Sequence, residues 1–456
     1  MRSVSVLICI LMTPWVIALW SAASIDERGS TLEGFTKVDP NGAQGVEATA
    51  ANMLVESPSG KKPHLLAGRD PSSRPLLVKL VNNFGHGNVK AYISGLDPNG
   101  NVFFVGSDGT SIYPDAKSSR SPVEISQEIA IPLRSGNEPL SIKIPSYIRS
   151  GRVYFSIGDL KFFVVDMGKG SSIIQPSVTN QRDPNANTNW GFIELTYIDE
   201  LLYANISYVD FVGIVLGMML VTKDGNSQTT AGLETDAVTK ICKDLSKQSK
   251  LDGHRWTSLC VINADRNPIR VLSPGNYHDI NPEMYDKYWD SYVADVWRKY
   301  AAQDLIIDTQ SEAGVVKCRV VGGKLVCNGS EQRFDKPTAK DIWGCNSGPF
   351  AASQHSTPIH IAVIPRLCAA FVRSTLLVEG GNIQPSLGQE SYYTTDTTNH
   401  YSRIVHSYEI DGRGYTFAYD DVNPDGTEDS SGVLSSNNVQ ALVIHVGGPI
   451  TQVSPR

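Results

Sequence analysis

Short apolar runs separated by turn residues dominate the chain between residue 75 and about residue 167. Turn-forming residues occupy 97–100 (Asp-Pro-Asn-Gly) and 107–109 (Ser-Asp-Gly) between such runs. The runs predicted as strands are 76–81, 89–93, 102–105, 125–131, 140–144, 152–157 and 160–165. Regularly spaced strands with almost no helical period predict a β-sandwich or β-barrel in this part of the chain.

The middle third of the chain follows a helical pattern instead. Apolar residues recur at helical spacing in 237–245, and 357–377 predicts a buried helix with Pro358 near its start. Asn281, followed by a proline and a glutamate, offers an N-cap for a long helix that runs to about residue 297. The aromatic stripe of that helix could be a platform for sugars. Because its three-to-four-residue spacing is typical of a buried face, we interpret it as core.

The β pattern returns near the C-terminus. Strand-like runs lie at 404–410, 415–419 and 439–446. We therefore predict a mainly β protein with an α+β part, in which residues 75–220 and 404–456 form one β domain and residues 221–403 form a mixed α/β domain inserted into it. Residues 25–74 are polar and poor in aromatic residues, which predicts a flexible leader or propeptide.

The N-terminal 24 residues have the pattern of a secretory signal peptide. Arg2 precedes an apolar run from residue 4 to residue 20, and the small residues 21–24 suit cleavage by signal peptidase. A membrane anchor is the alternative, but Pro14 and a span of about 17 residues argue against it. We expect a secreted protein, extracellular or in the cell wall, with no membrane contact after the signal is removed.

Composition limits the classes of binding partner and predicts the covalent modifications. The 456 residues carry a formal net charge of −7, which argues against nucleic-acid binding because phosphate contact needs a dense basic surface. Seven cysteines are present, and Cys9 lies in the signal, so export predicts three disulfides among the other six. Their connectivity is open, but Cys318 and Cys327 flank an apparent hairpin and are the expected pair. Asn205 and Asn328 begin glycosylation sequons; we expect Asn205 to be unmodified.

Several catalytic signatures are absent from the sequence. It has no G-x-S-x-G motif, no G-x-x-x-x-G-K-[ST] loop and no H-E-x-x-H motif. The His355 and His360 pair is five residues apart and is interrupted by Pro358, which is wrong for one helical face. We therefore expect no metal and no cofactor, and carboxylates become the candidate catalytic groups.

Two acids stand out because they lie in apolar, aromatic, β-prone segments. Glu194 lies in 190–197 and Asp210 lies in 206–212. They could be outward acids on half-exposed strands. Alternatively, they could be the proton donor and the ionised base of glycoside hydrolysis, where an apolar setting raises the pKa of the donor. A simple hairpin turning at 199–200 would offset them by about four residues, or ~13 Å, whereas inverting glycosidases need about 6.5–9.5 Å.

At these residues the sequence resembles the β-1,3-glucanases of glycoside hydrolase family 64, in their secreted fungal form. The segment 192–197 (Phe-Ile-Glu-Leu-Thr-Tyr), followed by 205–211 (Asn-Ile-Ser-Tyr-Val-Asp-Phe), is similar to that family's catalytic signature. Further similar segments are 150–155, 366–371, 373–377, 399–401 and 414–422. The resemblance covers about residues 75–450. One departure is Val372, where we expect asparagine.

The resemblance implies a thaumatin-like β-barrel domain beside the mixed α/β domain, with a wide groove between them. It implies inverting endo-hydrolysis of β-1,3-glucan that releases a short oligosaccharide such as the pentasaccharide. Glu194 would be the general acid and Asp210 the general base, although the two roles could be reversed. The residues expected to bind substrate are Thr196, Ser207, Tyr203 and Trp190.

Other polar groups in the segments similar to the family receive structural roles. We expect Asp420 and Asp421 to cap turns at least as readily as they would catalyse, and Arg366 and Arg373 to brace the helix and the domain junction. The alternative function is a non-catalytic β-glucan-binding or antifungal protein with the same thaumatin-like fold. A structural wall or effector protein is a third possibility. The expected partner is β-1,3-glucan, and the expected state is a monomer.

Overall fold

The largest sheet contains the strand that carries Glu194. The computed structural model describes residues 34–38, 45–49, 52–54, 75–84, 88–136, 138–168, 170–427 and 430–448, so the predicted signal peptide lies outside the described residues. The strand order is β25-β14-β13-β10-β4-β5-β6, with β8 also paired to β4. The strands are β4 (Val89–Leu96), β5 (Val102–Val105), β6 (Ser111–Ile112), β8 (Ile131–Pro132), β10 (Ile148–Ile157), β13 (Trp190–Ile198), β14 (Leu201–Ile206) and β25 (Leu434–Ser436).

A second sheet brings the C-terminal strand back to the first strands of the β region. Its order is β17-β16-β26-β3-β9. Its strands are β3 (Leu76–Asn82), β9 (Leu140–Ile144), β16 (Leu216–Thr222), β17 (Ser227–Thr230) and β26 (Val439–Val446). Strand β26 pairs in parallel with β3 and antiparallel with β16, which confirms the strand predicted at 439–446.

The two sheets pack as layers rather than closing on themselves. Strands β13, β14 and β25 of the first sheet contact β16 of the second. Among the described strands, each of the two sheets has two edge strands and does not close on itself. The predicted β-barrel is therefore wrong, and the sandwich alternative holds. The space between the layers is filled by large apolar residues of both sheets, as alternating inward positions require.

Two smaller sheets include short strands from the region that we expected to be a flexible leader. One sheet has the order β2-β12-β11-β7 and the other β1-β18-β19-β15. Their strands are β1 (Thr36–Lys37), β2 (Met53–Leu54), β7 (Val123–Glu124), β11 (Phe163–Asp166), β12 (Ser171–Ile174), β15 (Phe211–Val212), β18 (Cys260–Ile262) and β19 (Pro268–Leu272). Strands β1 and β2 lie at sheet edges, so backbone pairing orders Thr36–Lys37 and Met53–Leu54, two short pieces of the stretch expected to be a flexible leader.

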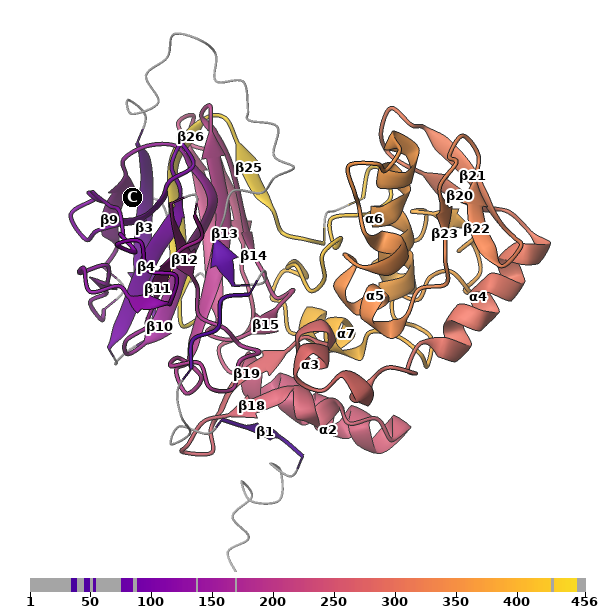
Figure 1. Ribbon diagram of the computed structural model, residues 1–456, viewed down its shortest axis with the longest axis horizontal. Coiled ribbons are helices and arrows are strands. Elements are labelled where there is room, and N and C mark those ends of the chain that lie inside the picture. Colours follow the sequence, from indigo (N-terminus) through magenta and orange to yellow (C-terminus); the bar gives the residue numbers. More distant parts are fainter. Residues whose placement is uncertain are drawn as a thin grey trace, which may run out of the picture. The chain divides into compact units, whose positions relative to one another are not determined.

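Helices alternate with short strands between residues 237 and 406. The α-helices are α2 (Ala237–Asp252), α3 (Pro274–Ile280), α4 (Asp290–Ala302), α5 (Ala339–Gly344), α6 (Pro358–Val372) and α7 (His400–His406). Short 3-10 turns occupy Trp256–Leu259, Pro282–Met284, Gly348–Phe350 and Gln389–Ser391. A sheet with the order β23-β22-β21-β20-β24 completes the region, from β20 (Leu305–Asp308), β21 (Val315–Val321), β22 (Lys324–Cys327), β23 (Arg333–Phe334) and β24 (Ile383–Gln384). Helix α6 packs against α5 and β20 (Figure 1).

Helix boundaries follow the capping chemistry only in part. Thr357 caps α6 by accepting a hydrogen bond from His360 N at 3.2 Å, with Pro358 at the first position as expected. The start predicted at Asn281 is wrong, because its side chain does not cap and α4 begins only at Asp290. The aromatic stripe before and within α4 is buried, which confirms its interpretation as core.

Three predicted strands are wrong. Within the run at 404–410, residues 404–406 end α7, because Tyr401, Ile404 and Val405 have helical spacing and are all buried. Residues 407–410 form turns, with a single bridge from Glu409 to Leu233. The run at 415–419 forms turns, with a single bridge between Tyr415 and Ser207. Most of 125–131 is loop. In each case a short apolar run was compatible with either a strand or another buried element, and tertiary packing decided.

Three disulfides join the described cysteines. Cys318–Cys327 links two residues that face each other across β21 and β22, which confirms the expected pair. Cys242–Cys260 links α2 to β18, and Cys345–Cys368 links the end of α5 to α6. Asn328 lies exposed just after β22, as its predicted turn position implies.

Candidate active site

Strand alternation places Glu194 on a polar face of the largest sheet. On β13, Glu194 and Thr196 are partly exposed, whereas Leu195 between them is buried. Arg152 of β10 and Asn205 of β14 lie directly opposite Glu194 in the two neighbouring strands. Tyr203 lies opposite Thr196 in the same way. Because residues directly opposite each other share a face, register alone gathers these five side chains.

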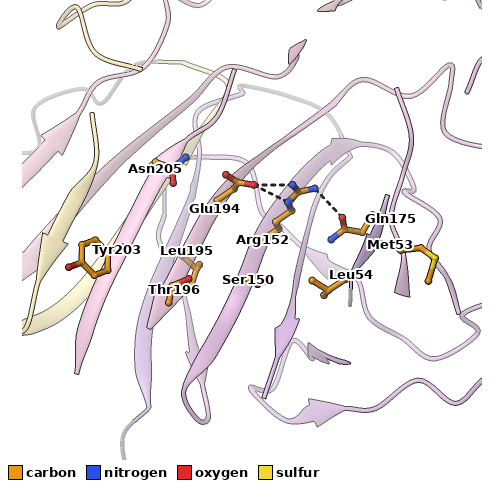
Figure 2. Close-up of a pocket in the computed structure, with 11 residues that line it drawn as sticks. Met53, Leu54, Ser150, Arg152, Gln175, Glu194, Leu195, Thr196, Tyr203 and Asn205 are labelled. Carbon is orange, nitrogen blue, oxygen red and sulfur yellow. Dashed lines mark hydrogen bonds and ion pairs between the residues drawn. The ribbon is translucent and has the colours of Figure 1, made fainter. Parts of the chain in front are cut away.

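Arg152 holds Glu194 through a charge-assisted pair. Its Nε and Nη2 atoms both donate to Glu194 Oε1, at 3.2 and 2.9 Å, and its Nη1 donates to Gln175 Oε1 at 3.0 Å (Figure 2). The guanidinium also lies 4.4 Å from the centre of the Phe192 ring. Bonds on both sides and an aromatic ring beneath fix the guanidinium, so it can fix the position of the carboxylate.

A pocket of about 470 Å³ opens over this face. Its lining includes Glu194 together with Thr196 and Tyr203, two of the four residues predicted to bind substrate. Tyr203 is 49% exposed and lies at one end of the pocket, so its ring is free to stack on a ligand (Figure 2). The remaining lining residues are Met53, Leu54, Ser150, Gly151, Arg152, Gln175, Leu195 and Asn205.

Asp210 lies beside this region because the chain leaves the sheet after β14. The next segment crosses the start of β13, where Ile214 N donates to Trp190 O at 3.3 Å. A Cβ on Gly213 would lie 2.0 Å from that Trp190 oxygen, so this crossing requires glycine. Phe211, next to Asp210, packs its ring 4.6 Å from that of Trp190. The hairpin between β13 and β14 turns at 199–200 as the sequence suggested, and the crossing redirects the chain only after that hairpin.

The electrostatics couple the two acids through Arg152. Burial raises the pKa of Asp210, and the negative charge of Glu194 raises it further, while Arg152 and the amide of Asn276 lower it. The charge of Arg152 interacts with both carboxylates. One carboxyl group therefore carries a raised pKa while the other is in an ion pair, and this division suits an acid–base pair.

Asp210 also lines a pocket of its own. This pocket, of about 230 Å³, includes residues of α3 and α5 such as Asn276 and Trp343. The backbone oxygen of Asp210 accepts hydrogen bonds from Ser273 N at 3.0 Å and from Asn276 Nδ2 at 3.1 Å. Helix α3 thus holds the Asp210 backbone in place, and the two acids line separate pockets.

The other two predicted substrate residues lie below the surface. Trp190 is only 3% exposed, and its ring packs against Phe192 and Phe211. Ser207 is buried in its bridge with Tyr415 and lines neither pocket. Both residues are thus buried in this structure, and their role in substrate binding stays a prediction.

A second cluster of charges is structural. Arg373 pairs with Asp420 at 3.0 Å, and His406 lies between Asp420, at 3.0 Å, and Glu409, at 2.7 Å. Asp420 Oδ2 also accepts from Thr416 N at 2.9 Å. This buried network braces α6, α7 and the following turns, in agreement with the structural roles expected for Arg373 and Asp420.

Sequence reasoning assigned no role to Arg152, Gln175 or the Met53–Leu54 strand. An arginine inside the otherwise apolar run 152–157 was the available signal for Arg152, because a buried charge needs a partner. Nothing in the sequence could have placed Met53 near Glu194, since the two are 141 positions apart. Among the described residues, no group of three or more metal-binding side chains is clustered, and no helix is long and apolar enough to span a bilayer.

Comparisons with known proteins identify similar chains. The family model described as β-1,3-glucanase, glycoside hydrolase family 64, matches residues 74–446. Glucan endo-1,3-β-glucosidases of Cellulosimicrobium cellulans and of Arthrobacter sp. (strain YCWD3) are each 30% identical over 315 residues. That alignment covers 67% of this chain and 53% of each relative, so the chain spans about half the length of these curated relatives.

Solved structures share the fold. A laminaripentaose-producing β-1,3-glucanase in complex with laminaritetraose superimposes with a TM-score of 0.72 at 25% identity, covering 83% of this chain and 99% of that one. A β-1,3-glucanase domain from Clostridium beijerinckii superimposes with a TM-score of 0.64 at 19% identity, covering 83% of this chain and 99% of that one.

Proposed function

We propose that this chain, which belongs to the β-1,3-glucanases of glycoside hydrolase family 64, is an endo-acting hydrolase of linear β-1,3-glucan. One observation carries the proposal: Glu194 lines an open, polar pocket with its carboxylate fixed by two hydrogen bonds from Arg152, and the charge of that arginine also acts on the buried Asp210. A binding protein needs the pocket but has no use for two coupled acids, whereas glycoside hydrolysis needs both.

The proposed reaction is a single displacement with inversion. One carboxylic acid protonates the glycosidic oxygen while the other carboxylate removes a proton from the attacking water. The family resemblance gives Glu194 the role of acid. The charges in the site favour the opposite order, because Arg152 forms an ion pair with Glu194 while burial raises the pKa of Asp210. We propose Glu194 and Asp210 as the acid–base pair. Rescue experiments decide which of the two is the acid and which is the base.

The proposed substrate matches the chemistry of the Glu194 pocket. Thr196 and Asn205 offer hydrogen-bonding groups for sugar hydroxyls, and Tyr203 offers an exposed ring for the C–H face of a sugar. The similar solved glucanase was crystallised with laminaritetraose, and its name describes release of laminaripentaose. For this chain we likewise propose that the substrate is linear β-1,3-glucan, that the product is a short oligosaccharide and that the enzyme acts outside the cell.

Matched amide variants test the acid pair. Glu194→Gln and Asp210→Asn should each lower reducing-end release from linear β-1,3-glucan by about 10²–10⁴-fold. Asp199→Asn, on the exposed turn that joins β13 to β14, removes a carboxylate from the same hairpin and should leave activity intact. The anomer formed first, followed by NMR, should be α. Wild-type activity in both amide variants would show that the site assignment is wrong.

Rescue experiments separate the two roles. A substrate with a good leaving group needs little protonation, so it should restore activity to the variant that lacks the acid. Azide can replace the activated water, so it should restore activity to the variant that lacks the base. Glucan binding without any hydrolysis by the wild-type protein would favour the alternative of a non-catalytic glucan-binding protein.

A further inference from the structure

The pocket around Glu194 has a wall that comes from outside the family-matched part of the chain. The match begins at residue 74, yet Met53 and Leu54 line the pocket. In the close-up, Glu194 lies between Tyr203 at one end and Met53 at the other (Figure 2). The pocket thus crosses β14, β13 and β10 and ends at β2.

The described residues of this N-terminal stretch, 45–49 and 52–54, are held in place by polar contacts; we call them the strap. Gly45 N donates to Arg182 O at 2.8 Å, and Glu47 pairs with Arg182 at 2.9 Å. The Asn52 side chain accepts from Thr49 N at 2.8 Å and donates to Glu47 O at 2.7 Å, so it ties these residues together just before the wall.

Backbone pairing then fixes the wall against the residue that holds Arg152. Leu54 and Met53 lie opposite Ile173 and Ile174 in the antiparallel pair of β2 and β12. Gln175 N donates to Asn52 O at 2.8 Å, while the Gln175 side chain accepts from Arg152. The position of the wall is therefore coupled by direct bonds to the Arg152–Glu194 pair.

The chemistry of the wall complements that of the opposite end. Leu54 is buried, and Met53 is partly exposed toward the pocket that it lines. Arg152, Glu194, Gln175 and Asn205 make the part between the two ends polar. An apolar thioether side chain at one end and a tyrosine ring at the other suit the C–H faces of sugar rings held over polar groups.

We propose that the strap residues Met53 and Leu54 form an end wall for the bound glucan and limit how many sugar residues extend past Glu194 on the Gln175 side. This inference rests on the proposed function, because it specifies how that same site takes its substrate. It makes the strap a determinant of product length that lies outside the part of the chain matched by the family.

Cleavage rates for linear β-1,3-gluco-oligosaccharides of increasing length test the wall. The variants are Met53→Ala, which opens the end, and Met53→Trp, which fills it. Met53→Ala should shift the main product from a long glucan toward longer oligosaccharides. Both variants should change kcat/KM by about threefold to tenfold only for substrates long enough to reach the wall. Glu47→Gln is the control, since Glu47 belongs to the strap but does not line the pocket.

The outcomes separate this inference from the proposed function. If the strap has only a structural role, the Met53 variants should cleave substrates of every length more slowly and should have a lower melting temperature. That result would overturn the proposal of an end wall. Identical product lengths and length dependence in wild type and both Met53 variants also overturn it, while leaving the hydrolase intact. Failure of the wild-type protein to cleave any oligosaccharide would instead contradict the proposed function.

Discussion

Arg152 offers the sharpest test of how the two acids work together. Arg152→Gln removes two charge-assisted hydrogen bonds to Glu194 and the positive charge that acts on Asp210. Arg152→Lys keeps the charge but loses the planar fork that lets two nitrogens reach one carboxylate oxygen. Comparing the two variants separates the effect of the charge from that of geometry.

The expected loss of activity depends on how exposed the Arg152–Glu194 pair is to water. Hydrogen bonds to charged groups contribute about 1.5–3 kcal/mol each. The Glu194 side chain is 37% exposed, so water weakens the pair, and a net loss of about 2 kcal/mol is reasonable. Because 1.36 kcal/mol corresponds to a tenfold change, kcat/KM of Arg152→Gln should fall by about 30-fold. Arg152→Lys should lose less.

The pH–rate profile of Arg152→Gln should shift in a direction that depends on the role of Asp210. Arg152 lowers the pKa of Asp210, so its removal raises that pKa further. If Asp210 is the acid, activity depends on its protonated form, and the alkaline limb of the Arg152→Gln profile moves to higher pH. If Asp210 is the base, activity depends on its ionised form, and the acidic limb moves to higher pH instead.

The assay is reducing-end release from linear β-1,3-glucan across about pH 3 to 9, with unfolding measured alongside. Arg149→Gln is the matched control, because Arg149 lies on the same strand but does not line the pocket. A profile of Arg152→Gln that superimposes on that of the wild type, at equal kcat/KM, would refute the reasoning.

Further predictions concern stability and substrate binding. Burial alone would lower the pKa of His406, but Glu409 and Asp420 raise it to about 10, so the stability that His406 contributes is full below about pH 6.5 and is lost as pH rises toward 10. Urea unfolding at neutral and alkaline pH should show this slope, and His406→Gln should abolish it. Asp420→Ala leaves Arg373 buried without its partner, so it should cost about 3–5 kcal/mol of unfolding free energy; an unchanged melting temperature would contradict this role. Tyr203→Ala should raise KM for glucan oligosaccharides about threefold to tenfold, with little change in kcat, if its exposed ring stacks on sugar.

Local sequence patterns predicted an element correctly where the pattern fitted only one kind of structure. The strands at 102–105 and 140–144 have the bounds predicted from the sequence: 102–105 is a short, fully buried apolar run between turns, and burial alternates along the end of 140–144. Cys318 and Cys327 paired as the hairpin implied. Predictions failed where a short apolar run had two compatible partners: 404–410 became part of a helix and turn because its helical face could be buried.

The sequence by itself determined that the chain is mainly β with a mixed α/β part, and it singled out Glu194 and Asp210 as acids in apolar surroundings. It also determined that Glu194 shares a face with Thr196, because the period of a strand is two residues. Only the tertiary structure decided what surrounds these acids. The crossing at Gly213 brings Asp210 beside the sheet, strand register places Arg152 opposite Glu194, and the strap adds Met53 from far away in the chain. Such contacts depend on register and on chain crossings, which arise from packing between distant segments and which no local pattern encodes.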